Sequence, residues 1–296
     1  LCGAYCALFG IFFLNRYTTS LNFAPMGTLD LTAAAGSKGL ILVIAMLMIF
    51  GFSVKGGMFP MHGWLPTAHP LAPAPASALL SGIIAKTGIL VIIRFVFYSI
   101  GPDFLRGTWV QTAWIILCLI TIFMGSMMAF REQNLKKRLA YSTVSQLSYA
   151  LLGLALLTQE GLNGSLLQVM QHASAKTCLF LCAGAFIWKY GKHRVDELHV
   201  IGKSMPVVLW CLTFAGMSLV GIPPMGGLIS KWFLVQGSLD AAPGIFAILA
   251  PVVLLVSALL TAGYLFPIMI NGFCPGKDKK TEFDPAGNTS GIREAA

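Results

Sequence analysis

Seven runs of apolar residues, each long enough to span a lipid bilayer, constrain the fold more than any other feature of these 296 residues. A membrane-spanning helix needs about 20 consecutive apolar residues. In hydrocarbon only helices and closed barrels satisfy every backbone polar group, and the runs lack the alternation of barrel strands. They therefore predict an all-α, polytopic membrane helix bundle. The runs are residues 39–59, 77–100, 109–130, 139–157, 165–188, 206–235 and 245–271, preceded by the end of an eighth at 1–14.

The composition excludes several other classes of protein. Charged residues make up 10% of the chain and hydrophobic residues 56%, whereas a soluble domain carries about 25% charged residues. A disordered chain, a collagen-like fibre and an ordinary cytosolic enzyme are all excluded. We expect one transmembrane domain over residues 1–271 and a polar cytoplasmic tail over residues 272–296. Because the chain begins inside an apolar run, we also expect it to be truncated at its N-terminus.

The basic residues predict an orientation. Twelve Lys and Arg residues lie in loops or the tail on one side of the predicted spans, and three lie on the other side. Loops rich in Lys and Arg stay in the cytoplasm, so we expect a protein integral to the bacterial cytoplasmic membrane with these loops inside. A nucleic-acid-binding patch is disfavoured because the membrane rule already explains the bases. The twelve are Arg131, Lys136, Lys137, Arg138, Lys189, Lys192, Arg194, Lys203, Lys277, Lys279, Lys280 and Arg293.

The other five bases lie inside the apolar runs, where the sequence places no Asp or Glu. A charge in mid-bilayer costs at least about 2.5–3.5 kcal/mol. Arg94 is close enough to the end of its run to extend toward the interface, whereas the four lysines lie deeper. A buried lysine can load and release a proton when a neighbouring charge changes. With His172, these lysines predict a proton relay. The four are Lys55, Lys86, Lys176 and Lys231.

Prolines and a polar stripe add two further expectations. Pro60 follows Lys55, and Pro223 and Pro224 precede Lys231; proline breaks a helix, and broken helices at membrane depth line cavities. The two runs cross in opposite directions, which is typical of an inverted repeat. Separately, Gln168, His172 and Lys176 recur every four residues and share one helix face. That stripe indicates either a relay or a hydrogen-bonded seam between helices.

The seven cysteines have no spacing that fits zinc or an iron–sulfur cluster. We interpret them as small buried hydrophobes, and we expect no cofactor in this chain.

Four ordered motifs resemble the proton-translocating antiporter-like family. This family comprises the large membrane subunits of complex I, Mrp-type sodium/proton antiporters, and membrane subunits of energy-converting and formate-linked hydrogenases. The resemblance covers roughly residues 1–271. The motifs are VKGGMFPMHGWLPTAHPLAPAPASALLSGIIAKTGILVIIRF (54–95), NLKKRLAYSTVSQLSYALLGL (134–154), QHASAKTCLFLCAGAF (171–186) and GIPPMGGLISKW (221–232).

The resemblance implies a fold of two inverted five-helix repeats, each with one broken helix. It implies that Lys55 is the central lysine of a first half-channel and Lys86 a connecting lysine. Lys176, with His172, resembles the relay toward the second half, and Lys231 the terminal lysine. Lys136 resembles a basic residue that serves proton uptake, with a plain positive-inside anchor as the alternative.

Two departures from the family are visible. Some relatives carry histidine where this chain has Gln168, so that step of the relay is weaker or different here. The family also pairs its first-half lysine with a glutamate on a helix that would lie upstream of Leu1.

The function implied is that of a proton-translocating membrane subunit in a redox-driven complex, of the NADH:quinone oxidoreductase or membrane-bound hydrogenase type. Redox cofactors are expected in partner subunits, and the partners are other membrane subunits and the lipid bilayer. An Mrp-type sodium/proton antiporter subunit is the alternative. A structural spacer would not need the buried lysines. For a membrane enzyme the only candidate residues are His62 and His69, which match family motif positions at a helix junction.

Overall fold

The computed structural model describes residues 2–20, 22–25, 27–30, 32, 36–198, 204–241 and 244–273. Lys203, Cys274 and nearly all of the predicted tail, with its four bases, lie outside these residues. The described part is helical, and its extended pairing is limited to single bridges at Thr18–Leu29 and Asn134–Arg194. The helices are α1 (Cys2–Leu14), η1 (Asn15–Tyr17), α3 (Lys38–Ser53), η2 (Met61–Gly63), α4 (Trp64–Leu71), α5 (Ala74–Gly82), η3 (Ile84–Lys86), α6 (Thr87–Phe95), η4 (Val96–Ile100), α7 (Pro102–Leu105), α8 (Trp109–Arg131), α9 (Leu135–Ala155), α10 (Gln159–Tyr190), η5 (Val195–Glu197), α12 (Pro206–Val220), α13 (Gly226–Ala241) and α14 (Phe246–Phe273).

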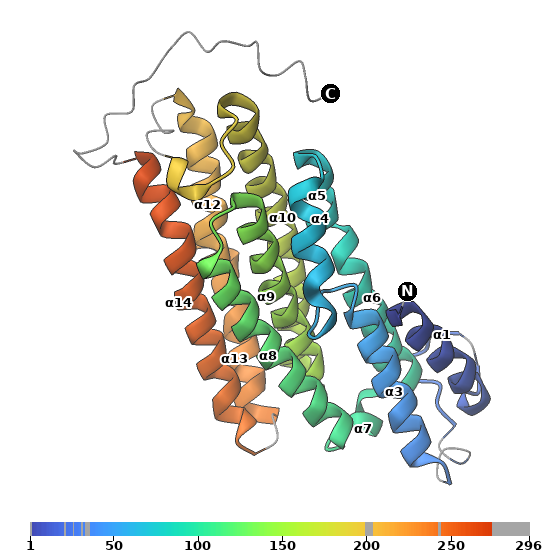
Figure 1. Ribbon diagram of the computed structural model, residues 1–296. Coiled ribbons are helices and arrows are strands. Elements are labelled where there is room, and N and C mark those ends of the chain that lie inside the picture. The colour runs from blue at the N-terminus through green and yellow to red at the C-terminus, as the bar shows by residue number, and fades with distance from the viewer. Residues whose placement is uncertain are drawn as a thin grey trace.

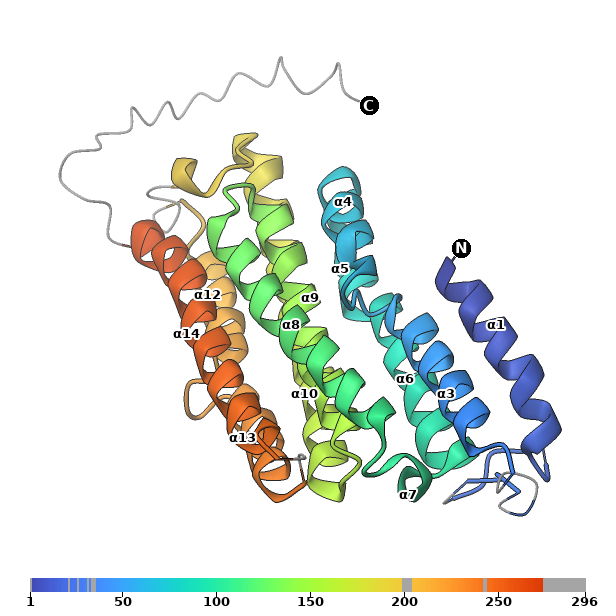
Figure 2. The same ribbon diagram turned by 60° about the horizontal axis from the view of Figure 1, so that its bottom comes forward.

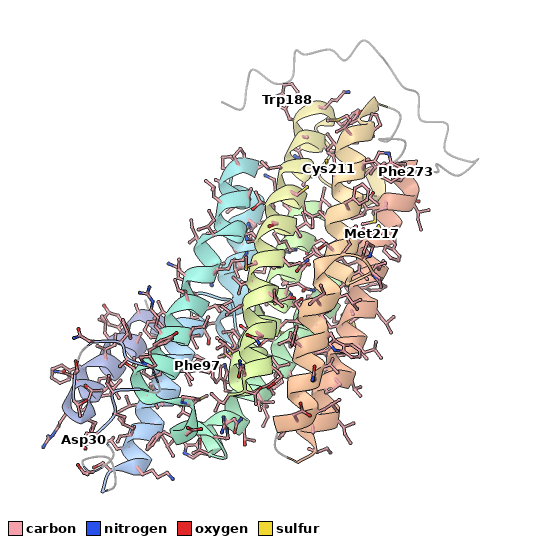
Figure 3. The ribbon with its side chains drawn as sticks, turned by 180° about the vertical axis from the view of Figure 1, so that it is seen from behind. Asp30, Phe97, Trp188, Cys211, Met217 and Phe273 are labelled. Carbon is pink, nitrogen blue, oxygen red and sulfur yellow. The ribbon has the colours of Figure 1, made fainter. Side chains whose placement is uncertain are left out.

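The long helices run roughly parallel to one axis, so that their ends gather at two opposite ends of the bundle (Figures 1 and 2). One flank holds α1, α3 and α6, and the other holds α8, α9, α10, α12, α13 and α14. Figure 3 shows Trp188 and Phe273 toward one end and Asp30 toward the other. These are called the Trp188 end and the Asp30 end below.

The bundle is that of an integral membrane protein. Three helical segments are both long and apolar enough to cross a bilayer, at Ala74–Ile100, Trp109–Arg131 and Phe246–Phe273, and α3 and α12 are shorter apolar helices. Trp188 is 78% exposed near one end of the bundle, and Trp109 is 50% exposed at the start of α8, near the other. Tryptophan is enriched at the two membrane interfaces. The predicted all-α membrane fold is confirmed for the described residues.

Two crossings of the bundle are made by broken helices, as the prolines predict. In the first, α3 rises from the Asp30 end and α4 continues toward the Trp188 end (Figure 1). In the second, α12 descends from the Trp188 end and α13 continues toward the Asp30 end (Figures 1 and 2). The peptide bonds Phe59–Pro60 and Pro223–Pro224 are cis. The broken helices therefore run in opposite directions, as an inverted repeat requires.

The predicted span at 39–59 is wrong in detail, whereas the span at 77–100 is confirmed within the helical segment Ala74–Ile100. The helix of the first span ends at Ser53, and residues 54–60 form the break; Gly57 has a φ of +78°, which an α-helix cannot contain. The second span is divided by a tight helical turn, η3, that ends at Lys86. Hydropathy does not reveal either interruption, because Lys55 and Lys86 are single charged residues in stretches that are otherwise mostly apolar.

Helix α9 lies at the centre of the fold. All of its residues except Lys137 and Tyr141 are buried. It packs against α8 on one side and α10 on another. Its start is capped by Asn134, whose side chain accepts a hydrogen bond from the amide of Lys137 at 3.2 Å. Because nearly all of α9 is buried, each polar side chain on it needs a partner inside the bundle, either on α9 itself or on a neighbouring helix.

Candidate functional site: lysines at the helix breaks

Lys231 lies in α13 beside the second break. Its ammonium Nζ donates to the carbonyl oxygens of Leu219 at 2.7 Å and Val220 at 2.6 Å. These carbonyls belong to the last turn of α12, which the break leaves without intrahelical partners. The C-terminal end of a helix also carries partial negative charge. The break therefore builds a binding site for an ammonium group at the junction of two half-helices.

Gly221 allows this close approach. Its φ is +90°, and a Cβ added there would lie 3.2 Å from Cδ and 3.4 Å from Nζ of Lys231. A side chain at this position would be strained in the backbone and would press on the lysine. The glycine at the break is therefore part of the Lys231 site.

Lys176 is fully buried in α10. Its Nζ donates to the carbonyl oxygen of Leu139 on α9 at 2.9 Å, and that oxygen also accepts from the Thr143 hydroxyl at 3.0 Å. The lysine is thus held by a neutral acceptor, with no carboxylate bonded to it.

Lys86 is 7% exposed at the end of η3. Its Nζ donates to the carbonyl oxygen of Ser81, one helical turn earlier. The Ser81 hydroxyl is 3.0 Å from the Thr143 hydroxyl. The hydroxyl contact between Ser81 and Thr143 therefore links the group that binds Lys86 to the group that binds Lys176. The carbonyl that Lys86 uses lies in the last turn of α5, just before the interruption at η3.

Two polar residues join the Lys176 region to Lys231. Gln168 donates from Nε2 to Oε1 of Gln146 on α9 at 2.7 Å, and the Ser230 hydroxyl, next to Lys231, donates to Oε1 of Gln168 at 2.7 Å. His172 lies one turn from Gln168, is 1% exposed, and has no hydrogen-bond partner at either ring nitrogen within the described part of the chain. The predicted stripe on α10 thus faces the interior, and it contacts α9 and α13.

Sequence reasoning did not single out Gln146, Ser230, Ser81 or Thr143. Each is a single polar residue in an apolar run, a pattern shared by many residues of this chain, so only the packing distinguishes them.

The sequence offers His69 as a candidate residue of a membrane enzyme and as part of a junction motif, and the structure places it inside the bundle. It is fully buried in α4, stacks on Phe180 with ring centroids 4.6 Å apart, and has no hydrogen-bond partner at either ring nitrogen among the described residues. Lys86, Lys136 and Lys176 are all close enough to interact with it electrostatically.

Lys136 lies at the Trp188 end of the same interior. It is 8% exposed, and its Nζ donates at 2.9 Å to the carbonyl oxygen of Ala72, between α4 and α5. Lys136 therefore lies between the buried polar groups and the Trp188 end of the bundle.

Lys55 is placed differently from the other three lysines. It lies in the first break, is exposed, and lines a pocket of about 930 Å³ together with Pro60, Trp64 and residues of α1 and α6. Within the described residues it makes no contact with the row formed by Lys86, Lys176 and Lys231. The sequence expectation of a lysine inside a helix is wrong for this residue, because the helix stops before it.

The ion pairs found among the described residues lie away from these lysines, at Arg106–Asp103, Lys137–Glu132 and Arg194–Asp196. Arg94 has its guanidinium 5.8 Å from the centre of the Phe23 ring, in the loops of the Asp30 end, as a side chain extending toward the interface would. The interior therefore holds a row of lysines whose ammonium groups are stabilised mainly by backbone carbonyl dipoles.

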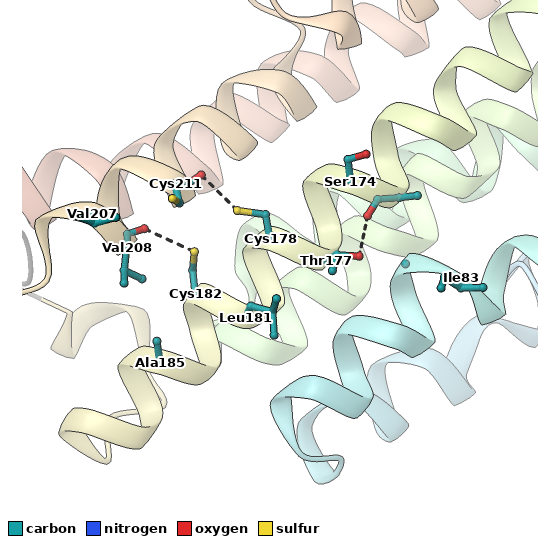
Figure 4. A pocket seen from close by; sticks show the side chains of 12 residues that line it. Ile83, Ser174, Thr177, Cys178, Leu181, Cys182, Ala185, Val207, Val208 and Cys211 are labelled. Atoms are coloured by element: carbon teal, nitrogen blue, oxygen red, sulfur yellow. Dashed lines mark hydrogen bonds between the residues drawn. The ribbon is translucent and has the colours of Figure 1, made fainter.

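Three cysteines line a groove on the outside of the bundle, between α10, α12 and the end of α5 (Figure 4). The Cys178 thiol approaches the carbonyl oxygen of Cys211 at 3.6 Å, and the Cys182 thiol that of Val208 at 3.5 Å (Figure 4). The cysteines of the described residues are free thiols, Cys118 and Cys182 are buried, and Cys2 and Cys211 are exposed. The expectation of buried cysteines is therefore correct for some and wrong for Cys2 and Cys211, which lie on outward faces.

The fold and this interior define a class of protein: a polytopic membrane helix bundle with inverted broken helices and a row of buried lysines. The chain belongs to the NADH:quinone oxidoreductase/Mrp antiporter transmembrane family, whose sequence profile matches residues 1–261.

Individual relatives come from several kinds of complex. The chain is 36% identical to NADH-quinone oxidoreductase subunit N of Desulforudis audaxviator, over 91% of this chain and 52% of that protein. It is 34% identical to hydrogenase-4 component B of Escherichia coli, over 88% of this chain and 40% of that protein. In a solved structure of the Mrp complex from Dietzia sp., a chain 29% identical superimposes with a TM-score of 0.79, over 91% of this chain and 48% of that one. The chain thus spans about half the length of these relatives.

Proposed function

We propose that this chain is the proton-translocating part of a membrane subunit in a redox-driven complex, of the NADH:quinone oxidoreductase or membrane-bound hydrogenase type. Protons move along Lys86, Lys176 with His172, and Lys231, with Lys55 at the first break and Lys136 at the uptake side. The observation that carries the proposal is the row of lysines whose ammonium groups donate to backbone carbonyls without a bonded carboxylate.

The chemistry of the row supports this role. A carbonyl dipole stabilises an ammonium group less than a carboxylate does. A neighbouring charge can therefore change whether each lysine is protonated. When one lysine gains a proton, repulsion favours loss of a proton from the next. A change of charge in a partner subunit can then propagate along the row.

Sidedness and partners are part of the proposal. The described bases cluster at the Trp188 end, in the loops after α8 and α10, and Arg16, Lys38 and Arg106 lie toward the Asp30 end. By the positive-inside rule the Trp188 end faces the cytoplasm of a bacterial cell. The similarity to subunits of an oxidoreductase, a hydrogenase and an Mrp complex supports partners that are other membrane subunits. The redox cofactors belong to those partners.

A sodium/proton antiporter subunit is the second candidate, favoured by the structural match to the Mrp complex. Sodium is a hard cation that prefers oxygen ligands, above all carboxylates. Among the described residues, the carbonyls of the site already accept hydrogen bonds from lysines, and no carboxylate joins them. This arrangement favours protons.

The test uses inverted membrane vesicles that contain the full-length protein in its native complex. Acidification of the vesicle lumen is measured with and without an electron donor, and with and without sodium. We expect acidification that needs the donor and ignores sodium, and its loss in Lys86→Met. Lys189→Met, which removes an exposed lysine at the Trp188 end, is the matched control and should transport normally. Acidification that needs sodium and no donor would instead establish the antiporter.

A further inference from the structure

Two glutamines on α10 bind the two halves of the second broken helix. Gln171 donates from Nε2 to the hydroxyl of Ser218 on α12 at 3.0 Å, and Gln168 accepts at Oε1 from the hydroxyl of Ser230 on α13 at 2.7 Å. The glutamines are three residues apart, a spacing that makes them neighbours on the surface of one helix. We call Gln168, Gln171, Ser218 and Ser230 the break clamp.

The break clamp borders the Lys231 site on both sides of the break. Ser218 directly precedes Leu219, whose carbonyl accepts from the Lys231 ammonium at 2.7 Å, and Ser230 directly precedes Lys231 itself. A bond at Ser218 therefore holds the turn that supplies the acceptor, and a bond at Ser230 holds the turn that supplies the donor. Helix α10 thus contacts both sides of the Lys231 interaction through the residues next to them.

The two half-helices pack closely where the break clamp binds them. A Cβ added to Gly227, at the start of α13, would collide with the carbonyl of Ser218 and lie 3.3 Å from Nε2 of Gln171. The Ser230 hydroxyl is also 3.1 Å from the Gly227 carbonyl. Gly227 therefore allows the start of α13 to lie against the last turn of α12, and Gln171 lies at this meeting point.

One side of the break clamp is anchored at the centre of the bundle. Gln168 is 1% exposed, and its Nε2 donates at 2.7 Å to Oε1 of Gln146 on the buried helix α9. Gln171 is half-buried and bonds to α12. The positions of both half-helices are therefore fixed relative to α10 and, through Gln168, relative to α9.

The other hydroxyl side chains of the two half-helices bond differently. Thr213 on α12 and Ser238 on α13 each donate to a carbonyl four residues earlier in their own helix, at 2.8 and 2.7 Å. Ser218 and Ser230 are the hydroxyl residues nearest the break, and they bond to side chains of α10. This difference indicates that the bonds to α10 belong to the break and not to the general packing of these helices.

We propose that Gln171, together with Gln168, positions the two half-helices so that the Lys231 ammonium meets the carbonyls of α12. The glutamines carry no proton, and they act on transport through Lys231. This inference rests on the proposed function, and it adds positioning residues to the site of the last lysine in the row. Of the two interpretations of the α10 stripe, it assigns to Gln168 the hydrogen bond between helices.

The test compares variants of the break clamp with matched controls. Gln171→Leu removes the amide with little change in size, and Ser218→Ala removes the hydroxyl that accepts from it. Ser218→Thr keeps that hydroxyl. Ser230→Ala tests the bond to the second half-helix. Ser238→Ala is the control, because this hydroxyl also lies on a half-helix but bonds to a carbonyl of its own helix.

Donor-driven acidification is measured in vesicles that hold the full-length protein in its complex, and each rate is divided by the amount of assembled complex. We expect Gln171→Leu, Ser218→Ala and Ser230→Ala each to lower the initial rate about fivefold, the factor equivalent to about 1 kcal/mol, the net contribution of one hydrogen bond. Ser218→Thr and Ser238→Ala should keep the rate of the unmodified protein.

The double variant of Gln171→Leu and Ser218→Ala tests whether the two residues act through one bond. Both changes remove the same hydrogen bond, so the double variant should also lose about fivefold, whereas independent losses would multiply to about 25-fold.

The dependence of the rate on pH separates positioning from general packing. The Lys231 ammonium faces the carbonyls of Leu219 and Val220 and the ring of Tyr149, whose centre is 5.5 Å away. Hydrogen bonds to the charged form of a group favour that form. Weaker carbonyl bonds in Gln171→Leu should therefore move the alkaline limb of the rate profile to lower pH. A packing defect would lower the rate by the same factor at every pH.

Rates and pH profiles like those of the unmodified protein in Gln171→Leu and Ser218→Ala would overturn the break clamp, as would an equal loss in Ser238→Ala or multiplied losses in the double variant. The unmodified protein and Lys231→Met are measured beside them. If the unmodified protein produces no donor-driven acidification, the proposed function fails, and the inference that rests on it fails too. If the unmodified protein acidifies the lumen, Lys231→Met does not, and the clamp variants do so at the normal rate, the break clamp alone fails.

Discussion

The ammonium of Lys231 lies 2.6 Å from the carbonyl oxygen of Val220, the last residue of α12. The lysine comes from the second half of a broken helix and its acceptor from the end of the first half. This relationship converts a helix break into a site for a positive charge, and it explains why proline and lysine occur close together in this part of the sequence.

Lys231→Met is expected to abolish donor-driven proton transport while the complex still assembles. Methionine keeps the unbranched apolar stem, and the freed carbonyls of α12 lie only part-buried. The measurement is acidification of vesicles together with the yield of intact complex on a native gel. Transport at the rate of the unmodified protein would remove Lys231 from the pathway.

Gly221→Ala should destabilise the protein by at least about 1 kcal/mol, because its φ of +90° strains any residue with a Cβ. It should also slow transport, because the added Cβ presses on the lysine side chain. Gly107→Ala is the control, since Gly107 has a φ of +72° and open space around it. Both variants should lower the melting temperature in detergent. Equal transport in the two variants would show that the contact with Lys231 has no role.

Lys176→Met tests the middle of the row. The Leu139 carbonyl keeps its bond from Thr143, so the fold loses little. We expect normal assembly and loss of transport of at least about tenfold, since no other group on α10 at this depth carries a lysine's proton. The rates of Lys176→Met and Lys189→Met are compared in one vesicle preparation; indistinguishable rates would contradict the assignment.

Lys136→Arg separates proton uptake from a positive-inside anchor. Arginine keeps the charge and can still donate to the Ala72 carbonyl, but it does not release a proton. If Lys136 takes up protons, transport should fall about tenfold in this variant. An anchor requires only the positive charge, so an unchanged rate would establish that simpler role. The initial rate of acidification at several external pH values is the measurement.

Glu132 should give the loop between α8 and α9 a stability that depends on pH. Partial burial raises the pKa of its carboxyl, but hydrogen bonds from Lys137 and from the amides of Asn134 and Gln133 outweigh this, so the pKa lies below its usual value. A carboxyl with a lowered folded pKa stabilises the fold above its unfolded value of about 4.3, and this stability is lost as pH falls through the folded pKa. The contribution is small, about 0.2–1 kcal/mol for a partly exposed pair.

Hydrogen exchange of the loop amides between pH 3 and pH 6 is the measurement, after correction for the intrinsic rate. Glu132→Gln should flatten the dependence, and Lys137→Met should reduce it. An unchanged profile in Glu132→Gln would show that another group controls the loop.

Patterns along the chain are sufficient to establish the membrane environment, the all-α fold, the two broken helices and the family. These follow from properties that lie along the chain: the length of an apolar run, the position of a proline, and ordered motifs. The sequence also identifies Lys86, Lys176 and Lys231 as bases inside apolar runs, because a charge among apolar residues is visible without knowledge of its neighbours.

The contacts between polar groups, in contrast, depend on how the helices pack. The carbonyl acceptors of Lys86 and Lys231 lie at the ends of α5 and α12, which hydropathy does not reveal, and the acceptor of Lys176 lies on α9, which only packing brings near it. The exposure of Lys55, the burial of His69 and the contacts of Gln146 depend on how distant helices pack. The hydroxyl contacts among Ser126, Ser145 and Ser257 join residues 19, 112 and 131 positions apart. A pattern read along one helix cannot contain such a relationship, because it depends on the register of three helices against one another.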